Sequence, residues 1–82
     1  MTNRQFAERL NRELDGIEAP LREDERVEAF SKMFHIPKFR AEAILHGTYL
    51  PDENLLNAVA DEFEINADWL IGKSENRQKK AS

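Results

Sequence analysis

The 82-residue sequence contains no cysteine, which excludes a disulfide scaffold and any thiolate metal site and fits a reducing cytoplasm. No stretch approaches the ~20 consecutive apolar residues that a membrane span needs, and the first residues enter a charged amphipathic pattern rather than an apolar leader. No segment alternates with period two, and no repeat recurs along the chain. We therefore expect one small cytoplasmic domain with no membrane partner.

Residues suited to catalysis are also scarce. The sequence has no glycine-rich phosphate loop and no cysteine nucleophile, and no carboxylate pair is focused on its two histidines, His35 and His46. The simplest interpretation of His35 is a turn residue. We expect no enzymatic activity, no cofactor and no bound metal ion.

Glycine and proline, three of each, occur at consistent places. Each glycine follows a segment of helical periodicity, and each proline lies in or just before the start of one. This pattern predicts an all-α fold of five helices: Asn3–Asp15, a second ending at Phe34, Pro37–His46, a fourth before Ile65 and Ala67–Ile71. Side chains suited to capping stand at four helix starts: Thr2 with Gln5, Asp24, Asp52 and Asn66.

The second and third predicted helices are separated only by His35 and Ile36, so the chain must turn sharply between them. At 100° per residue, one side of the third helix is apolar and the other is mixed. The apolar side carries Ala41, Ile44 and Leu45, and the mixed side carries Phe39, Glu42, Ala43 and His46. Two helices, a tight turn and an exposed mixed face predict a helix-turn-helix.

The run from Phe30 to Pro51, FSKMFHIPKFRAEAILHGTYLP, resembles the lambda-repressor-like (Xre/Cro type) helix-turn-helix domain of phage repressors. The similarity covers about residues 4–72 and includes the closing DWLIG at 68–72. It departs at His35, where glycine is usual, at the small Ala41, and at Phe39, where a polar residue is common. The resemblance implies a five-helix lambda-repressor-like bundle over residues 1–72.

The resemblance also implies that the mixed face reads base edges in the major groove of double-stranded DNA. Its base-reading positions are Lys38, Phe39, Glu42 and Ala43. Phe39 and Ala43 form an apolar strip suited to thymine methyl groups, whereas Lys38 and Glu42 suit guanine and cytosine. Candidates for contacts with the DNA backbone are Arg22, Arg26, Arg40, His46, Thr48 and Tyr49.

Each of these roles has a plainer alternative. Lys38 and Arg40 carry charges that any solvated helix surface carries, and His46 also suits a plain helix end. Phe39 suits a core position or a contact with another protein. The Trp69–Ile71 segment (Trp69, Leu70, Ile71) is either core or, as domains of this resemblance often pair through their C-terminal helices, a dimer seam.

Charge is unevenly distributed in this chain of net charge −4. Residues 51–72 hold six acidic and no basic side chains, while the third helix is positive. Residues 73–82, KSENRQKKAS, have a single apolar residue and predict a disordered basic tail. A DNA-facing side can be basic while the opposite face is acidic, because salt screens distant charges.

The sequence therefore predicts a nucleoid-associated transcriptional regulator, a repressor that binds a two-fold operator as a homodimer. The alternative is a protein-interaction module of the same fold, an antitoxin or antirepressor with a protein partner. That module would use the acidic helix 4–5 surface over Asp52–Asp68, or the strip of Phe39 and Ala43.

Overall fold

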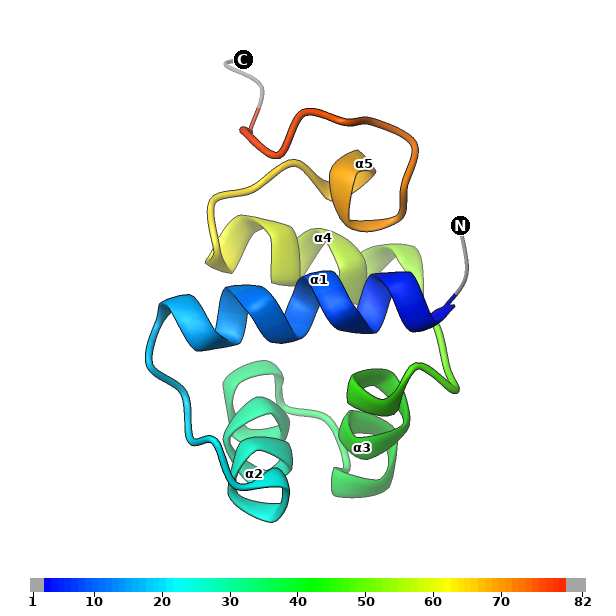
Figure 1. The fold of residues 1–82 in the computed structure, drawn as a ribbon. Coiled ribbons are helices and arrows are strands. Elements are labelled where there is room, and N and C mark those ends of the chain that lie inside the picture. The colour runs from blue at the N-terminus through cyan, green and yellow to red at the C-terminus, as the bar shows by residue number, and fades with distance from the viewer. Residues whose placement is uncertain (1–2, 80–82) are drawn as a thin grey trace.

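The computed structural model describes residues 3–79. Over this range the chain forms five helices and no strand (Figure 1). They are α1 (Asn3–Gly16), α2 (Glu23–Phe34), α3 (Lys38–His46), α4 (Glu53–Glu62) and α5 (Ala67–Leu70). A single antiparallel bridge joins Ile65 to Gln78. The predicted all-α class is confirmed. Within the described range, no helix combines the length and the apolar character that crossing a membrane requires.

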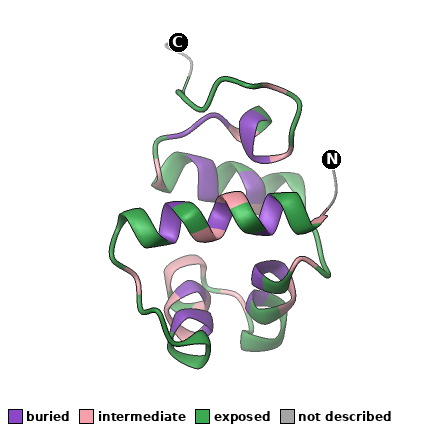
Figure 2. Ribbon diagram, viewed as in Figure 1, coloured by how far each residue is buried: buried purple, intermediate pink, exposed green. Residues whose placement is uncertain are grey.

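The five helices close a ring around one core. α1 contacts α3 on one side and α5 on the other, while α2 contacts α3 and α4, and α4 contacts α5 (Figure 1). Buried positions recur along the inner faces of the helices (Figure 2). In α1 they are Phe6, Leu10 and Leu14, whose spacing of four residues keeps them on one stripe. The largest fully buried side chains from the rest of the chain are Phe30, Ile44, Val59, Ile65 and Leu70.

Most helix ends follow the sequence signals. Asp52 accepts a hydrogen bond from the Leu55 N–H (2.8 Å), and Asn66 accepts one from the Asp68 N–H (3.0 Å). Gly47 closes α3 at φ 80°. Among the described residues, three other than glycine also have positive φ, each just past a helix end: Glu18 (59°), His35 (54°) and Glu64 (54°).

The start of α2 differs from the prediction. The helix begins at Glu23 with Arg22 as its N-cap, because the Arg22 carbonyl already accepts the Arg26 N–H at 2.8 Å. Asp24, predicted to be the cap, therefore lies in an acidic first turn, where negative charge is favourable to the helix dipole. The predicted capping box of helix α1 depends on Thr2, which lies outside the described residues.

Residues 73–79, here called the C-terminal strap, lie against the helices, whereas the composition predicted a disordered tail. The Asn66 N–H donates to the Arg77 carbonyl (2.9 Å), and its side-chain amide donates to the Asn76 carbonyl (3.0 Å). Lys79 pairs with Asp61 at 3.2 Å, which places a cation by the acidic end of α4. The prediction was wrong because the composition of a segment does not show which hydrogen-bonding and charged partners the fold places beside it. Residues 80–82 of the predicted tail lie outside the described part.

Candidate nucleic-acid interface

Helix α3 presents two different faces, as its periodicity predicted. Ala41, Ile44 and Leu45 are buried against the core. The exposed side chains of the helix are Lys38, Phe39, Arg40, Glu42 and His46, and Ala43 is half-buried between them. Phe39 is 73% exposed, so the core alternative for this residue is excluded. These exposed residues make up the outer face of α3, a helix that lies beside α2 in the lower part of the molecule as drawn in Figures 1 and 2.

The turn between α2 and α3 is held by hydrogen bonds to one serine. The N–H groups of His35 and Ile36 both donate to the Ser31 carbonyl, the latter at 3.1 Å. The Ser31 hydroxyl donates in turn to the Ile36 carbonyl at 2.5 Å. His35 takes the left-handed conformation (φ 54°, ψ 47°) that the sharp corner needs. These bonds fix the direction in which α3 leaves α2.

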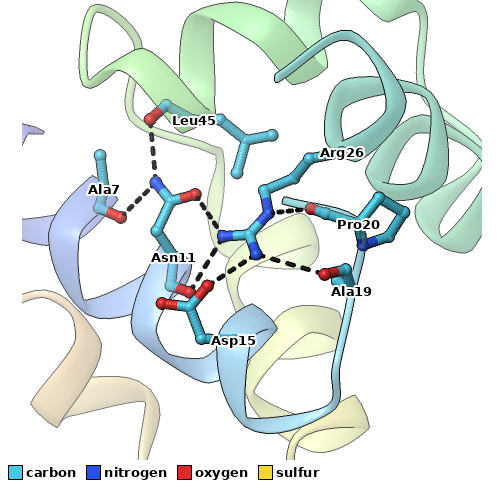
Figure 3. A network of polar contacts seen from close by, with 7 residues as sticks. All are labelled: Ala7, Asn11, Asp15, Ala19, Pro20, Arg26 and Leu45. Carbon is cyan, nitrogen blue, oxygen red and sulfur yellow. Dashed lines mark hydrogen bonds and ion pairs between the residues drawn. The ribbon is translucent and has the colours of Figure 1, made fainter. Parts of the chain in front are cut away.

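Arg26 lies at the centre of a buried polar network that joins α1, α2 and the loop between them (Figure 3). Its guanidinium donates to the Pro20 carbonyl (2.8 Å), to Asp15 (2.6 Å) and to the side-chain oxygen of Asn11 (3.2 Å). Two weaker contacts reach the carbonyls of Asn11 and Ala19. Only 8% of Arg26 is exposed. The predicted phosphate contact by Arg26 is therefore corrected: this side chain holds the fold together.

Asn11 extends the same network to the candidate interface. Its side-chain amide donates to the Ala7 carbonyl (2.9 Å) and to the Leu45 carbonyl in the last turn of α3 (3.1 Å) (Figure 3). Arg26 orients Asn11 through the amide oxygen, which leaves the amide nitrogen free to make both bonds. The sequence carried one signal for Arg26: it lies four residues before the buried Phe30, on the inner stripe of α2.

The α2 side of the outer face is acidic. An open groove of about 450 Å³ between α2 and α3 is lined by Glu23, Asp24, Val27, Glu28, Lys38 and Glu42. A hydrogen bond from Lys32 and the nearby charge of Lys38 lower the pKa of Glu28 below its ordinary value. The groove therefore combines four carboxylates with one lining cation.

Two residues predicted to meet phosphates are paired with these carboxylates. Arg22 lies 3.6 Å from Asp24 and 3.8 Å from Glu25, in solvent-exposed ion pairs. The His46 imidazole contacts the Glu23 carboxylate. The acidic run at 23–25 is visible in the sequence, but only the fold brings it beside the end of α3. Sequence reasoning did not identify Glu23 as a partner of His46.

The loop after α3 lies beside the opposite edge of the outer face. The Thr48 N–H (2.9 Å) and hydroxyl (3.1 Å) both donate to the Ala43 carbonyl, so neither donor is free for a phosphate. Tyr49 is 41% exposed, and the Arg40 guanidinium lies 5.9 Å from the centre of its ring. No carboxylate lines the hollow between α3 and this loop.

The Trp69–Ile71 segment lies away from α3 and is mostly core. Trp69 is 7% exposed and Leu70 is fully buried, so neither offers a surface to a second copy. The guanidinium groups of Arg9 and Arg77 lie 4.8 and 5.9 Å from the Trp69 ring, and Arg9 also donates to the Trp69 carbonyl. Of the predicted dimer seam, only Ile71 is even half-exposed.

No protein-family model, no curated protein sequence and no solved structure matches this chain. Within residues 3–79, no group of three or more acidic, histidine or cysteine side chains is placed to hold a metal ion. A function for the chain is therefore argued from the geometry of α3 and its surroundings.

Proposed function

We propose that this chain is a lambda-repressor-like helix-turn-helix protein that binds double-stranded DNA in a sequence-specific manner. The observation that carries the proposal is the outer face of α3. Five of the nine residues of α3 are exposed, and the helix projects from a turn fixed by Ser31. An α-helix fits the ~12 Å wide major groove, where its first turns reach base edges.

The base-reading residues of the proposed complex are Lys38, Phe39, Glu42 and Ala43. All but the half-buried Ala43 are exposed, and within residues 3–79 none of these four side chains makes a hydrogen bond. Lys38 suits guanine O6 and N7, and Glu42 suits the amino group of cytosine. The buried network of Arg26 and Asn11 supports this role indirectly, because it holds the last turn of α3 against α1.

Phosphate contacts in this proposal are few. Arg40 is exposed, and no carboxylate lines the hollow beside it, so it is the strongest candidate; the Tyr49 hydroxyl is the next. Arg22 and His46 would first have to leave their acidic partners. We expect roughly two phosphate contacts from each chain, which predicts modest affinity and a shallow dependence on salt.

The modest contact set supports binding as a homodimer to a two-fold operator. Doubling the contacts across half-sites ~34 Å apart brings specificity into a useful range, and a protein that occupies such a site acts most simply as a repressor. Because Trp69 and Leu70 are buried, we place the contact between the two copies elsewhere on the surface.

Selection of binding sites from a randomised duplex pool at ~150 mM salt tests the proposal directly. Enrichment of an inverted repeat with half-sites about one helical turn apart is the expected result. The matched control is the Lys38→Ala/Glu42→Ala double variant, which removes two exposed side chains and leaves the core unchanged. A folded wild-type chain that enriches no sequence would overturn the proposal.

A protein-interaction module is the second candidate, and the acidic groove between α2 and α3 favours it. Four carboxylates line this groove, at an edge of the outer face that DNA phosphates would approach. Such a module would bind a basic surface of a partner protein, in the manner of an antitoxin or antirepressor. DNA-binding experiments distinguish the two candidates. A protein-interaction module would enrich no sequence from the randomised duplex pool. Replacing Glu28 and Glu42 with lysine would then create an affinity for DNA that the wild-type chain lacks.

A further inference from the structure

We propose that the hollow between α3 and the loop that follows it is a pocket for the 5-methyl group of a thymine. The pocket rests on the proposed function, because the thymine is presented in the major groove of bound DNA. It gives the Tyr49 ring a role beside the bases, in addition to the phosphate contact proposed for the Tyr49 hydroxyl.

The hollow is lined by side chains from two segments. Its volume is about 190 Å³, and its lining residues are Phe39, Arg40, Ala43, Thr48 and Tyr49. Phe39 and Ala43 are one helical turn apart on α3, so they lie on the same side of the helix. Thr48 folds the loop back onto α3 through its two hydrogen bonds to the Ala43 carbonyl, and the next residue, Tyr49, lines the hollow from the loop side.

The walls are apolar and open to solvent. Phe39 is 73% exposed and Tyr49 is 41% exposed, although burying either ring would be favourable. Exposed aromatic side chains that line one hollow indicate a ligand with an apolar part. Because Ala43 ends at its β-carbon, a ligand group in the hollow can approach the helix surface closely.

The chemistry of the hollow selects among apolar ligands. A cage of aromatic rings also suits a methylated ammonium ion, but the Arg40 guanidinium at its edge, 5.9 Å from the Tyr49 ring centre, repels a cation. The same positive charge attracts a nucleic-acid strand. In the major groove only thymine presents an apolar group, its 5-methyl, and alanine and phenylalanine are suited to contact it. The hollow and its charged edge therefore fit thymine in duplex DNA.

Replacing thymine with deoxyuridine tests the pocket, because the exchange removes the methyl group and preserves base pairing. In the selected operator, each thymine is exchanged in turn, and binding is measured by fluorescence anisotropy. We expect one position in each half-site to lose about fourfold in affinity, the effect of one methyl group no longer buried. The other positions are expected to change little.

Two variants connect the effect to the hollow. Phe39→Ala and Tyr49→Ala are expected to bind the thymine and deoxyuridine operators equally well, whereas the wild-type chain distinguishes them. Leu50→Ala is the matched control, since Leu50 is similarly exposed (43%) and adjoins Tyr49 but does not line the hollow. It should retain the fourfold preference. Circular dichroism checks that each variant is folded.

Three outcomes would overturn the pocket. If the wild-type chain binds its operator but tolerates deoxyuridine at every position, the pocket fails and the DNA-binding proposal stands. If the preference persists in both Phe39→Ala and Tyr49→Ala, the methyl group is read elsewhere. If Phe39→Ala changes the sedimentation of the free protein from dimer to monomer, the hollow is a contact between copies. Failure to select any operator would instead remove both proposals.

Discussion

Arg77 and Glu13, 64 residues apart in the sequence, are joined by two parallel hydrogen bonds. The Arg77 Nε donates to Oε2 at 2.7 Å, and its Nη2 donates to Oε1 at 2.5 Å. The Glu13 side chain is only 9% exposed, whereas that of Arg77 is 54% exposed. The hydrogen bond to the carboxylate raises the pKa of Arg77 above its ordinary value. This pair attaches the C-terminal strap to α1.

Arg77→Ala is expected to lower the free energy of unfolding by about 1–3 kcal/mol, because it leaves the buried Glu13 carboxylate without its cation. Urea denaturation followed by circular dichroism measures the change. Lys79→Ala is the matched control from the same strap, since it removes an exposed ion pair with Asp61. The control should cost less than ~1 kcal/mol. Equal losses in the two variants would contradict a special role for Arg77.

Arg26→Ala is expected to cost about 2–4 kcal/mol of stability, because Asp15 and the Pro20 carbonyl lose a buried partner. Arg26→Lys should recover only part of the loss, as an ammonium group cannot reproduce the planar fork. Thermal unfolding compares both with Arg22→Ala, whose side chain is 74% exposed and should change stability by less than ~0.5 kcal/mol. If Arg22→Ala were the more damaging of the two alanine variants, the network would not have the structural role assigned to it.

Gly47→Ala is expected to destabilise the protein by about 1–3 kcal/mol. A β-carbon at Gly47 would lie 2.9 Å from the Cα of Arg4 on α1, and φ is +80° there. At Gly16, by contrast, a β-carbon meets nothing within 4 Å, and alanine is the better helix former. Gly16→Ala should therefore be neutral or stabilising by up to ~1 kcal/mol. Melting temperatures that fall equally in both variants would contradict the close approach of α1 to the end of α3.

Lys32→Ala is expected to raise the pKa of Glu28 toward its ordinary value of 4.5, because the hydrogen bond from Lys32 is the largest cause of the lowered pKa. A carboxylate with a lowered pKa stabilises the fold above its ordinary pKa. This contribution is lost as the pH falls through the lowered value. Titration of the Glu28 carboxyl carbon by NMR at low salt measures the shift. Lys38→Ala should raise the pKa less, and a larger effect from Lys38 would reverse the assigned order of causes.

Arg40→Ala is expected to weaken binding to all DNA sequences about equally and to reduce the slope of log K against log [salt] by about 1 per chain. Lys79→Ala removes the same charge from the strap, at the opposite end of the molecule from α3 (Figure 1), and should leave the slope unchanged. Anisotropy titrations at several salt concentrations distinguish the two variants. An unchanged slope in Arg40→Ala would remove Arg40 from the phosphate contacts.

The helices were predictable because their signals are local. Gly47, Asp52 and Asn66 act through neighbours two to five residues away, and the apolar period of each helix selects its inner face. The outer face of α3 was predictable for the same reason. These signals indicate where a helix begins and which side is buried, and the structure agrees with most of them, the start of α2 being an exception.

Pairing between distant charges was not predictable in this way. Arg22 and Arg26 stand four residues apart in one charged run, yet the first is exposed and the second is buried. The difference arises because α1 places Asn11 and Asp15 opposite one of them. Glu13 is buried for the same reason, since the fold places Arg77 of the C-terminal strap beside it. A charged residue on an apolar stripe is the sequence signal that would identify such pairs.

The left-handed conformations of Glu18, His35 and Glu64 have a consequence for engineering the protein. A side chain in this conformation costs on the order of 1 kcal/mol that glycine avoids, but glycine also costs ~0.5–1 kcal/mol because it gives the unfolded chain more freedom. The two effects nearly cancel at each position. The three residues lie in three separate loops, so the effects of replacing them are expected to add. Glycine at all three positions should therefore leave the free energy of unfolding almost unchanged, and none of the replacements alters the outer face of α3.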